Sequence, residues 1–199
     1  MEPTQKKVSG MWIAVGVIVV LALFVFGSYN GLVIKDEGVK KAWSAVESQY
    51  QRRSDLIPNL VETVKGAANF EQTTLTQVVE ARAKATSITV DPTKLDQASI
   101  AKFQAAQGEL STALGKLLAI SEQYPTLTAT QNFRDLQSQL EGTENRITVA
   151  RKDYGDAVNT YSIALRSFPT NLIAKIFGFS ERGYFQSEQG ADKAPAVSF

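Results

Sequence analysis

The chain has 199 residues, of which 44% are hydrophobic, and 21 Lys and Arg stand against 20 Asp and Glu. It contains no Cys and no His, which excludes disulfides, thiolate nucleophiles, Cys/His zinc sites and the commonest general base near neutral pH. A nucleic-acid-binding protein usually carries a basic excess or stripe, and this chain has neither. The composition therefore favours a binding or assembly protein over an enzyme and predicts no cofactor, no metal and no nucleic-acid partner.

Residues 11–34 form an uncharged segment that follows a short tail, residues 1–10. About 20 apolar residues are needed to cross the hydrocarbon core, so this segment predicts one transmembrane helix and its exit from the bilayer. Trp12 and Tyr29 lie near its two ends, where aromatic residues suit the membrane interfaces. The alternative is a cleaved signal peptide, with the basic residues of the tail ahead of the apolar run; we favour the transmembrane helix, which makes the lipid bilayer a partner.

Gly27 and Gly31 form a pair of small residues four apart at the outer end of this segment. Such a pair lets two membrane helices pack closely. An equally good interpretation is a flexible exit from the bilayer. Both glycines are therefore candidate interaction residues.

Residues 35–180 carry apolar side chains at the alternating three and four spacing of amphipathic helices. The first helix continues from the membrane segment, and Pro58 predicts a kink or break near residues 56 and 57, because proline removes a backbone donor and crowds the preceding turn. Further helices are expected at about 93–124, about 128–168 and 171–179, before an irregular tail, residues 181–199. Single apolar stripes must pack on one another, so the expected fold is all-α: a transmembrane helix followed by an elongated antiparallel helical bundle.

Several stretches go beyond periodicity and resemble the LemA family. They are TyrAsnGlyLeuVal at 29–33, the block AlaTrpSerAlaValGluSerGlnTyrGlnArgArgSerAspLeuIleProAsnLeuValGluThrValLys at 42–65, GluAlaArgAla at 80–83, GluAsnArgIleThrValAlaArg at 144–151, TyrPhe at 184–185 and the final ProAlaValSerPhe. The chain departs from the family pattern at Phe70, where a histidine is common, and at Gly155 and Ser162, where asparagine usually follows each tyrosine.

The resemblance implies a helical bundle with a membrane anchor and no enzymatic activity. It also bears on orientation, because many members carry a lipoprotein-type cysteine just before the TyrAsn pair, and a lipoprotein domain lies outside the cytoplasm. Counting Lys and Arg on the two sides of the span would instead place the domain in the cytoplasm. That rule is weak for a long following domain, so we expect a single-pass inner-membrane protein with a periplasmic domain.

Arg52, Arg53 and Asp55 lie close to Pro58, and Arg53 falls on the apolar stripe of its helix. One interpretation is a polar site for an anionic ligand or lipid head group near the membrane. The favoured alternative is an internal ion pair that fixes helix register, with Glu144 among the partners.

Five carboxylates could be imagined as a metal site inside a helical bundle: Glu62, Glu71, Glu80, Glu144 and Asp153. Bundle sites of this class normally include histidines in a Glu-x-x-His arrangement. The chain has no histidine, so a metal site is not predicted.

Aromatic residues gather in the last short helix and the tail, including Phe177, Tyr184, Phe185 and Phe199. A small domain has limited surface to cover them, and large exposed apolar patches usually mark contacts. We expect them to join copies of the chain, whereas the alternative is that the tail folds back on its own bundle.

Two functions follow from these features. The first is a membrane-anchored scaffold that self-associates and organises or shapes the envelope membrane. The second is a membrane-bound sensor or adaptor that binds a small ligand or an envelope protein, and an enzyme is a distant third. The mass of the protein in mild detergent separates the first two, because a large oligomer favours the scaffold.

Overall fold

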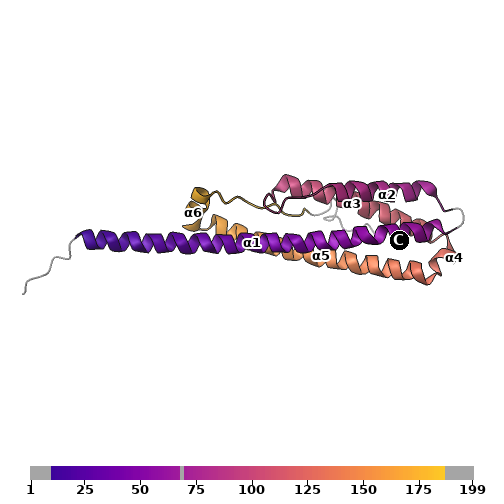
Figure 1. Cartoon of the computed structure of the whole chain (residues 1–199), viewed down its shortest axis with the longest axis horizontal. Helices are drawn as coiled ribbons and strands as arrows, with labels where there is room; N and C mark the ends of the chain where they lie inside the picture. The colour runs from indigo at the N-terminus through magenta and orange to yellow at the C-terminus, as the bar shows by residue number, and fades with distance from the viewer. Residues whose placement is uncertain (1–9, 68–69, 187–199) are drawn as a thin grey trace, which may run out of the picture.

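The computed structural model describes residues 10–67 and 70–186, and within them it contains six α-helices and no strand. The molecule is a long rod in which the first helix extends well beyond the other five (Figure 1). The expected all-α architecture, a long apolar N-terminal helix followed by an elongated bundle, is confirmed.

Helix α1 spans Gly10–Lys65 and is 56 residues long, which corresponds to roughly 84 Å at 1.5 Å per residue. Its N-terminal part has a mean hydropathy of 2.6 with none of its side chains buried, and among the described residues it is the one helix long and apolar enough to cross a membrane. Leu32 is the first buried residue of α1. The candidate membrane span and the bundle therefore share one uninterrupted helix.

The sequence predicted a kink or a break near residues 56 and 57, and the break is wrong, because α1 continues through Pro58 as far as Lys65. Pro58 has no N–H, so the carbonyl of Ser54, four residues earlier, loses its usual helical donor. Arg82 on the neighbouring helix supplies a replacement, with Nε donating to the Ser54 carbonyl oxygen at 2.9 Å. The chain instead leaves the helix after Lys65, and the next helix begins at Gln72.

The remaining helices are α2 (Gln72–Ser87), α3 (Gln97–Ser121), α4 (Pro125–Thr128), α5 (Gln131–Arg166) and α6 (Thr170–Phe177). Side-chain caps set two of the starts: Asp96 accepts from the Ser99 N–H ahead of α3, and Thr130 accepts from the Phe133 N–H ahead of α5. Helix α5 lies along α1, and the α2 and α3 pair covers the far half of the rod (Figure 1).

Two apolar clusters form the core, one on each side of a polar layer. The cluster nearer the membrane span is built around Trp43, Tyr154 and Tyr161, and the far cluster around Leu60, Leu117 and Phe133, among other residues. On α1 the first cluster ends at Tyr50 and the second begins at Ile57. Arg53, which is only 2% exposed, lies between them.

Residues 178–186, which we call the strap, leave α6 and run back along the bundle. The strap begins at Gly178, whose φ of 75° caps α6 in the left-handed region that glycine tolerates best. It has no regular secondary structure. Its contacts, described below, hold it against three helices.

Candidate functional site

Arg53 is the centre of a polar cluster that joins three helices. From α1, its Nη1 donates to the Ser111 hydroxyl at 2.7 Å and to a Glu144 carboxylate oxygen at 3.0 Å. Its Nη2 donates to the carbonyl and the side-chain oxygen of Gln107, at 3.2 and 2.7 Å. Gln107 and Ser111 lie on α3 and Glu144 on α5. The guanidinium also lies 5.0 Å from the centre of the Tyr50 ring.

The geometry of the cluster suits the predicted role of fixing helix register. The planar guanidinium presents its donors in fixed directions, so it is satisfied only when α3 and α5 sit at one position along α1. Sliding either helix by one turn would leave a buried charge without its acceptors, which is costly. The Arg53–Glu144 ion pair anticipated from the sequence is present, with the Glu144 side chain 53% exposed.

The other members of the predicted anion site do not join Arg53. Arg52 and Asp55 are both exposed, and Asp55 accepts a hydrogen bond from Gln51 at 2.7 Å. Pro58 is also exposed, on the outer side of α1. Because the two terminal nitrogens of Arg53 are occupied by protein acceptors, the four residues do not form a binding site together.

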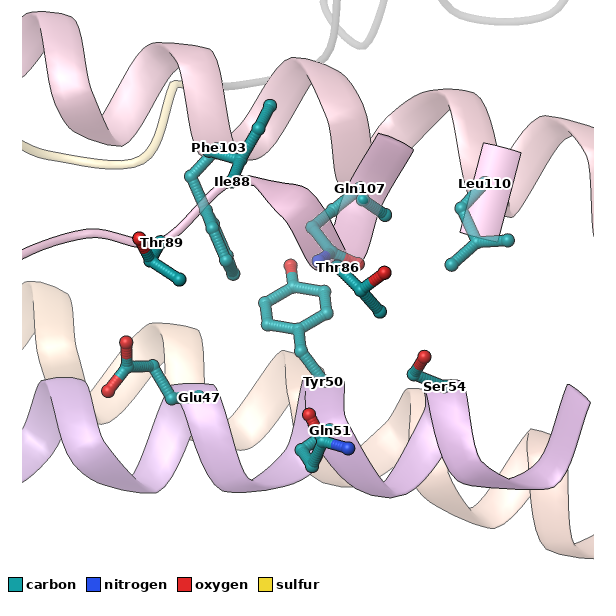
Figure 2. Close-up of a pocket in the computed structure, with 11 residues that line it drawn as sticks. Glu47, Tyr50, Gln51, Ser54, Thr86, Ile88, Thr89, Phe103, Gln107 and Leu110 are labelled. Carbon is teal, nitrogen blue, oxygen red and sulfur yellow. The ribbon is translucent and has the colours of Figure 1, made fainter. Parts of the chain in front are cut away.

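A cleft lies beside this layer, between α1, the end of α2 and α3 (Figure 2). The Tyr50 ring rises from α1 toward Phe103 and Gln107, and the Tyr50 and Phe103 ring centroids are 5.1 Å apart. Burial raises the pKa of the Tyr50 hydroxyl above its ordinary value, against the opposing effect of the nearby Arg151 and Arg53 guanidinium groups. The phenol therefore stays protonated at neutral pH.

The cleft is small and holds no recognisable catalytic arrangement. Its volume is about 120 Å³, whereas sites for small organic ligands usually measure about 300–1,000 Å³. Burial raises the pKa of Glu47 at its rim, but the chain has no His or Cys to act beside it. Across residues 10–67 and 70–186, no three acidic side chains gather closely enough to hold a metal ion.

The strap places Tyr184 and Phe185 against their own bundle. The centroid of the Phe185 ring lies 6.0 Å from that of Trp43, 5.5 Å from that of Tyr154 and 4.7 Å from the Arg151 guanidinium carbon. The main chain of Tyr184 is held by the side chain of Gln97. These two aromatic residues thus follow the alternative in which the tail folds back, and Phe199 lies outside the described residues.

A buried ion pair fastens the strap where α1 enters the bundle. Arg182 donates from Nε and Nη2 to one oxygen of Asp36, at 2.9 and 2.6 Å, and from Nη1 to the Thr93 carbonyl at 2.8 Å. Gly183 then donates its N–H to the Leu95 carbonyl at 2.7 Å. The strap therefore ties α1 to the connection between α2 and α3.

The remaining candidates lie at the membrane end of the rod. Gly27 is exposed on the part of α1 that projects from the bundle, whereas Gly31 is half-buried where α1 enters it, and an added Cβ at either position would meet nothing within 4 Å. Phe177, at the end of α6, is 51% exposed, and its ring centroid lies 4.9 Å from that of Tyr29. The two glycines thus lie on a helical stretch and not in a flexible exit.

Sequence reasoning missed the polar partners that come from distant parts of the chain. Arg82 lies in the GluAlaArgAla stretch, and a helical proline is a signal that a carbonyl four residues earlier needs a donor. Asp36 could have been singled out because it lies on the same helical face as Leu32 and Val39, where a buried carboxylate needs a partner. Nothing in the local sequence pointed to Gln107 as a partner of Arg53 or to Arg182 as the partner of Asp36.

Comparison with known proteins agrees with these features. The LemA family model matches residues 42–199. The chain is 29% identical over 181 residues to magnetosome protein MamQ 2 of Paramagnetospirillum magneticum and 26% identical to magnetosome protein MamQ of Magnetospirillum gryphiswaldense, covering 82% of this chain and 66% of each relative. It is 22% identical to protein LemA of Metamycoplasma hominis over 94% of this chain and 84% of that protein. The chain is therefore a membrane-associated helical protein that belongs to the LemA family.

Proposed function

We propose that this protein is a membrane-anchored scaffold that self-associates and thereby organises or shapes the membrane that holds it. The main observation that supports the proposal is the continuity of α1, which passes from the apolar segment into the bundle core without a linker. A bundle joined to its span by one helix projects from the bilayer in a defined direction. Anchors of the same orientation also confine such rods to one plane and raise their effective concentration.

The relatives support a role at a membrane. Two of them are named as magnetosome proteins, and this chain spans 66% of their length. We extend from those names only the expectation that the helical domain acts where a membrane is organised. The partners proposed are the lipid bilayer, further copies of the same chain and a protein of the cell envelope.

The second candidate is a membrane-bound sensor or adaptor, and the cleft beside Tyr50 is the observation that favours it. Its walls combine polar and aromatic side chains, as binding sites do. Its volume of about 120 Å³ has room for a few water molecules but not for a typical organic ligand. The cleft therefore supports this role less well than the continuous helix supports the scaffold.

Self-association predicts that the full chain, extracted in mild detergent, has a defined mass several times that of one copy. Mass photometry or light scattering with detergent correction measures it. A monomer at all protein concentrations would contradict the scaffold.

Copies of the chain could associate through their membrane helices or through their helical domains, and one variant distinguishes these two surfaces. Gly31→Leu enlarges one member of the small pair at the outer end of the span, and an added Cβ there would meet no atom of another helix within 4 Å. If the helical domains associate, this variant keeps the full mass. A fall to monomer would place the contact between the membrane helices.

We further propose that the protein spans the inner membrane once and that its domain is periplasmic. Ser87, exposed at the end of α2, offers a test because the chain has no cysteine of its own. In cells with a permeabilised outer membrane and an intact inner membrane, Ser87→Cys should react with a membrane-impermeant thiol reagent, while the parent chain should not. Labelling that requires lysis of the inner membrane would place the domain in the cytoplasm.

A further inference from the structure

Helix α6 has two apolar faces, and the bundle covers only one of them. Ile173 and Ala174 are buried, at 7% and 3% exposure. Leu172, Ile176 and Phe177 are 51%, 75% and 51% exposed, and Phe168, just ahead of the helix, is 81% exposed. Isolated exposed apolar residues are ordinary, but four large ones within residues 168–177 form a cluster of the kind that marks a contact surface.

The position of α6 along the rod identifies what this surface meets. The rings of Phe177 and Phe179 lie 4.9 and 5.6 Å from that of Tyr29. Tyr29 lies two residues, or about 3 Å along the helix axis, beyond Gly27, where the continuous apolar run of α1 ends. Figure 1 shows α6 beside α1 at the end of the bundle from which the apolar part of α1 projects. The exposed face of α6 thus lies at the level where α1 leaves the hydrocarbon core.

The charges around α6 match the surface of a bilayer that contains anionic lipid. Arg166 and Lys175 are both exposed, and residues 157–180 include no Asp or Glu. The next acidic residue, Glu181, lines the same cleft as these two basic residues, so the three side chains together carry a net positive charge. Basic side chains near a membrane surface attract anionic head groups, and the apolar side of an interfacial helix enters the boundary between head groups and acyl chains. A second copy of this chain would also cover an apolar face, but it would not require the face to coincide with the end of the span.

We infer that α6 and Phe168 form a second membrane contact, in which Phe168, Leu172 and Ile176 enter the interface of the leaflet that α1 leaves. Two attachments, one along the span and one beside it, restrict both the tilt and the rotation of the rod. The inference rests on the membrane anchor and is independent of self-association. It assigns the exposed aromatic and aliphatic residues of α6 to lipid and not to another subunit.

Depth-dependent fluorescence quenching tests the contact with the full chain reconstituted in vesicles. Ile176→Cys carries an environment-sensitive fluorophore at an exposed position, and Val79→Cys on α2, also an exposed apolar residue at 50% exposure, carries the same fluorophore far from the membrane. The vesicles contain phosphatidylcholine with or without phosphatidylglycerol, and spin-labelled lipids report the depth. We expect a blue-shifted, lipid-quenched signal from position 176 and an unquenched signal from position 79.

The electrostatic part of the inference has its own variant. With phosphatidylglycerol present, Lys175→Gln should reduce the ratio of quenched to unquenched label at position 176 about five-fold, the effect of one basic residue near an anionic surface. In phosphatidylcholine alone it should change little. An equal effect in both lipids would overturn the role assigned to anionic head groups.

Two outcomes overturn the membrane contact itself. One is a label at position 176 that spin-labelled lipid does not quench in either vesicle, in protein whose helical content is unchanged by circular dichroism. The other is a blue shift without lipid quenching that disappears on dilution of the protein in lipid, which would assign the face to a second copy. Mass determination on the same samples distinguishes this inference from the proposed scaffold. A monomeric protein whose label is quenched by lipid would support the membrane contact and contradict self-association.

Discussion

Replacing Arg53 with alanine is expected to lower the free energy of unfolding by about 3 to 5 kcal/mol, because a large buried side chain is lost and the buried Gln107 acceptor is left without its donor. The variant removes four hydrogen bonds that join α1 to α3 and α5. It leaves the buried Gln107 side chain without its charged donor and opens a gap between the two apolar clusters. For a chain of this size the midpoint of thermal unfolding should fall by about 10 °C.

Arg52→Ala is the matched control, because Arg52 is the preceding residue of the same helix and is exposed. Its effect should stay within about 0.5 kcal/mol, as for most surface substitutions. Thermal melts of the full chain in mild detergent, followed by circular dichroism, compare the two variants. Equal small shifts would show that Arg53 does not hold the helices together.

Arg53→Lys asks whether charge alone is sufficient. Lysine keeps the positive charge, but a single ammonium group on a flexible stem cannot reproduce the planar fork that reaches Gln107, Ser111 and Glu144 at once. We expect a melting temperature between those of the parent chain and Arg53→Ala. Full recovery would mean that the ion pair with Glu144 accounts for the whole effect.

The second large effect is expected from Gly183→Ala in the strap. A Cβ at this position would lie 2.7 Å from the Gln97 Cα, 2.8 Å from the Gln97 nitrogen and 2.9 Å from the Asp96 carbonyl carbon. These are main-chain atoms at the start of α3, so they cannot move aside as a flexible side chain would. The strap must shift, and we expect a loss of about 3 kcal/mol, the upper part of the range for overpacking.

Displacement of the strap should be visible beyond the melting temperature. The Tyr154 hydroxyl donates to the Gly183 carbonyl at 2.9 Å, and the neighbouring Phe185 stacks on Trp43. When the strap moves, Trp43 loses this cover, so its fluorescence should shift to longer wavelength and become accessible to a soluble quencher. Because Trp12 also fluoresces, the comparison is made in a Trp12→Phe background.

Gly108→Ala controls for the substitution itself. Gly108 is an exposed residue inside α3, and an added Cβ there would meet nothing within 4 Å. Alanine is the better helix former by about 0.5 to 1 kcal/mol, so this variant should be slightly more stable than the parent chain. If Gly183→Ala were equally harmless, the strap would not be packed on α3 as described.

Local sequence patterns were sufficient for the membrane segment and for most of the helices, but not for the boundary between α1 and α2. An uncharged apolar run predicted the span, and the three and four spacing from Trp43 onward predicted the amphipathic helices and most of the buried residues, because burial of a helix follows its own periodicity. The same spacing placed Arg53 on a buried face. That position alone required a carboxylate partner, and Glu144 could be named among those available.

Only the tertiary structure decided how distant segments complete one another. Pro58 predicted a kink or a break, but α1 is continuous in the structure. Arg82, from another helix, donates to the Ser54 carbonyl that the proline leaves without a helical donor. The aromatic residues of the tail predicted contacts between copies. In the structure Arg182 of the strap pairs with Asp36 of α1, and Phe185 of the same strap packs on Trp43 in its own core. Helix periodicity is a property of neighbouring residues, whereas these pairs depend on which helices lie side by side, and folding alone brings them within hydrogen-bonding distance.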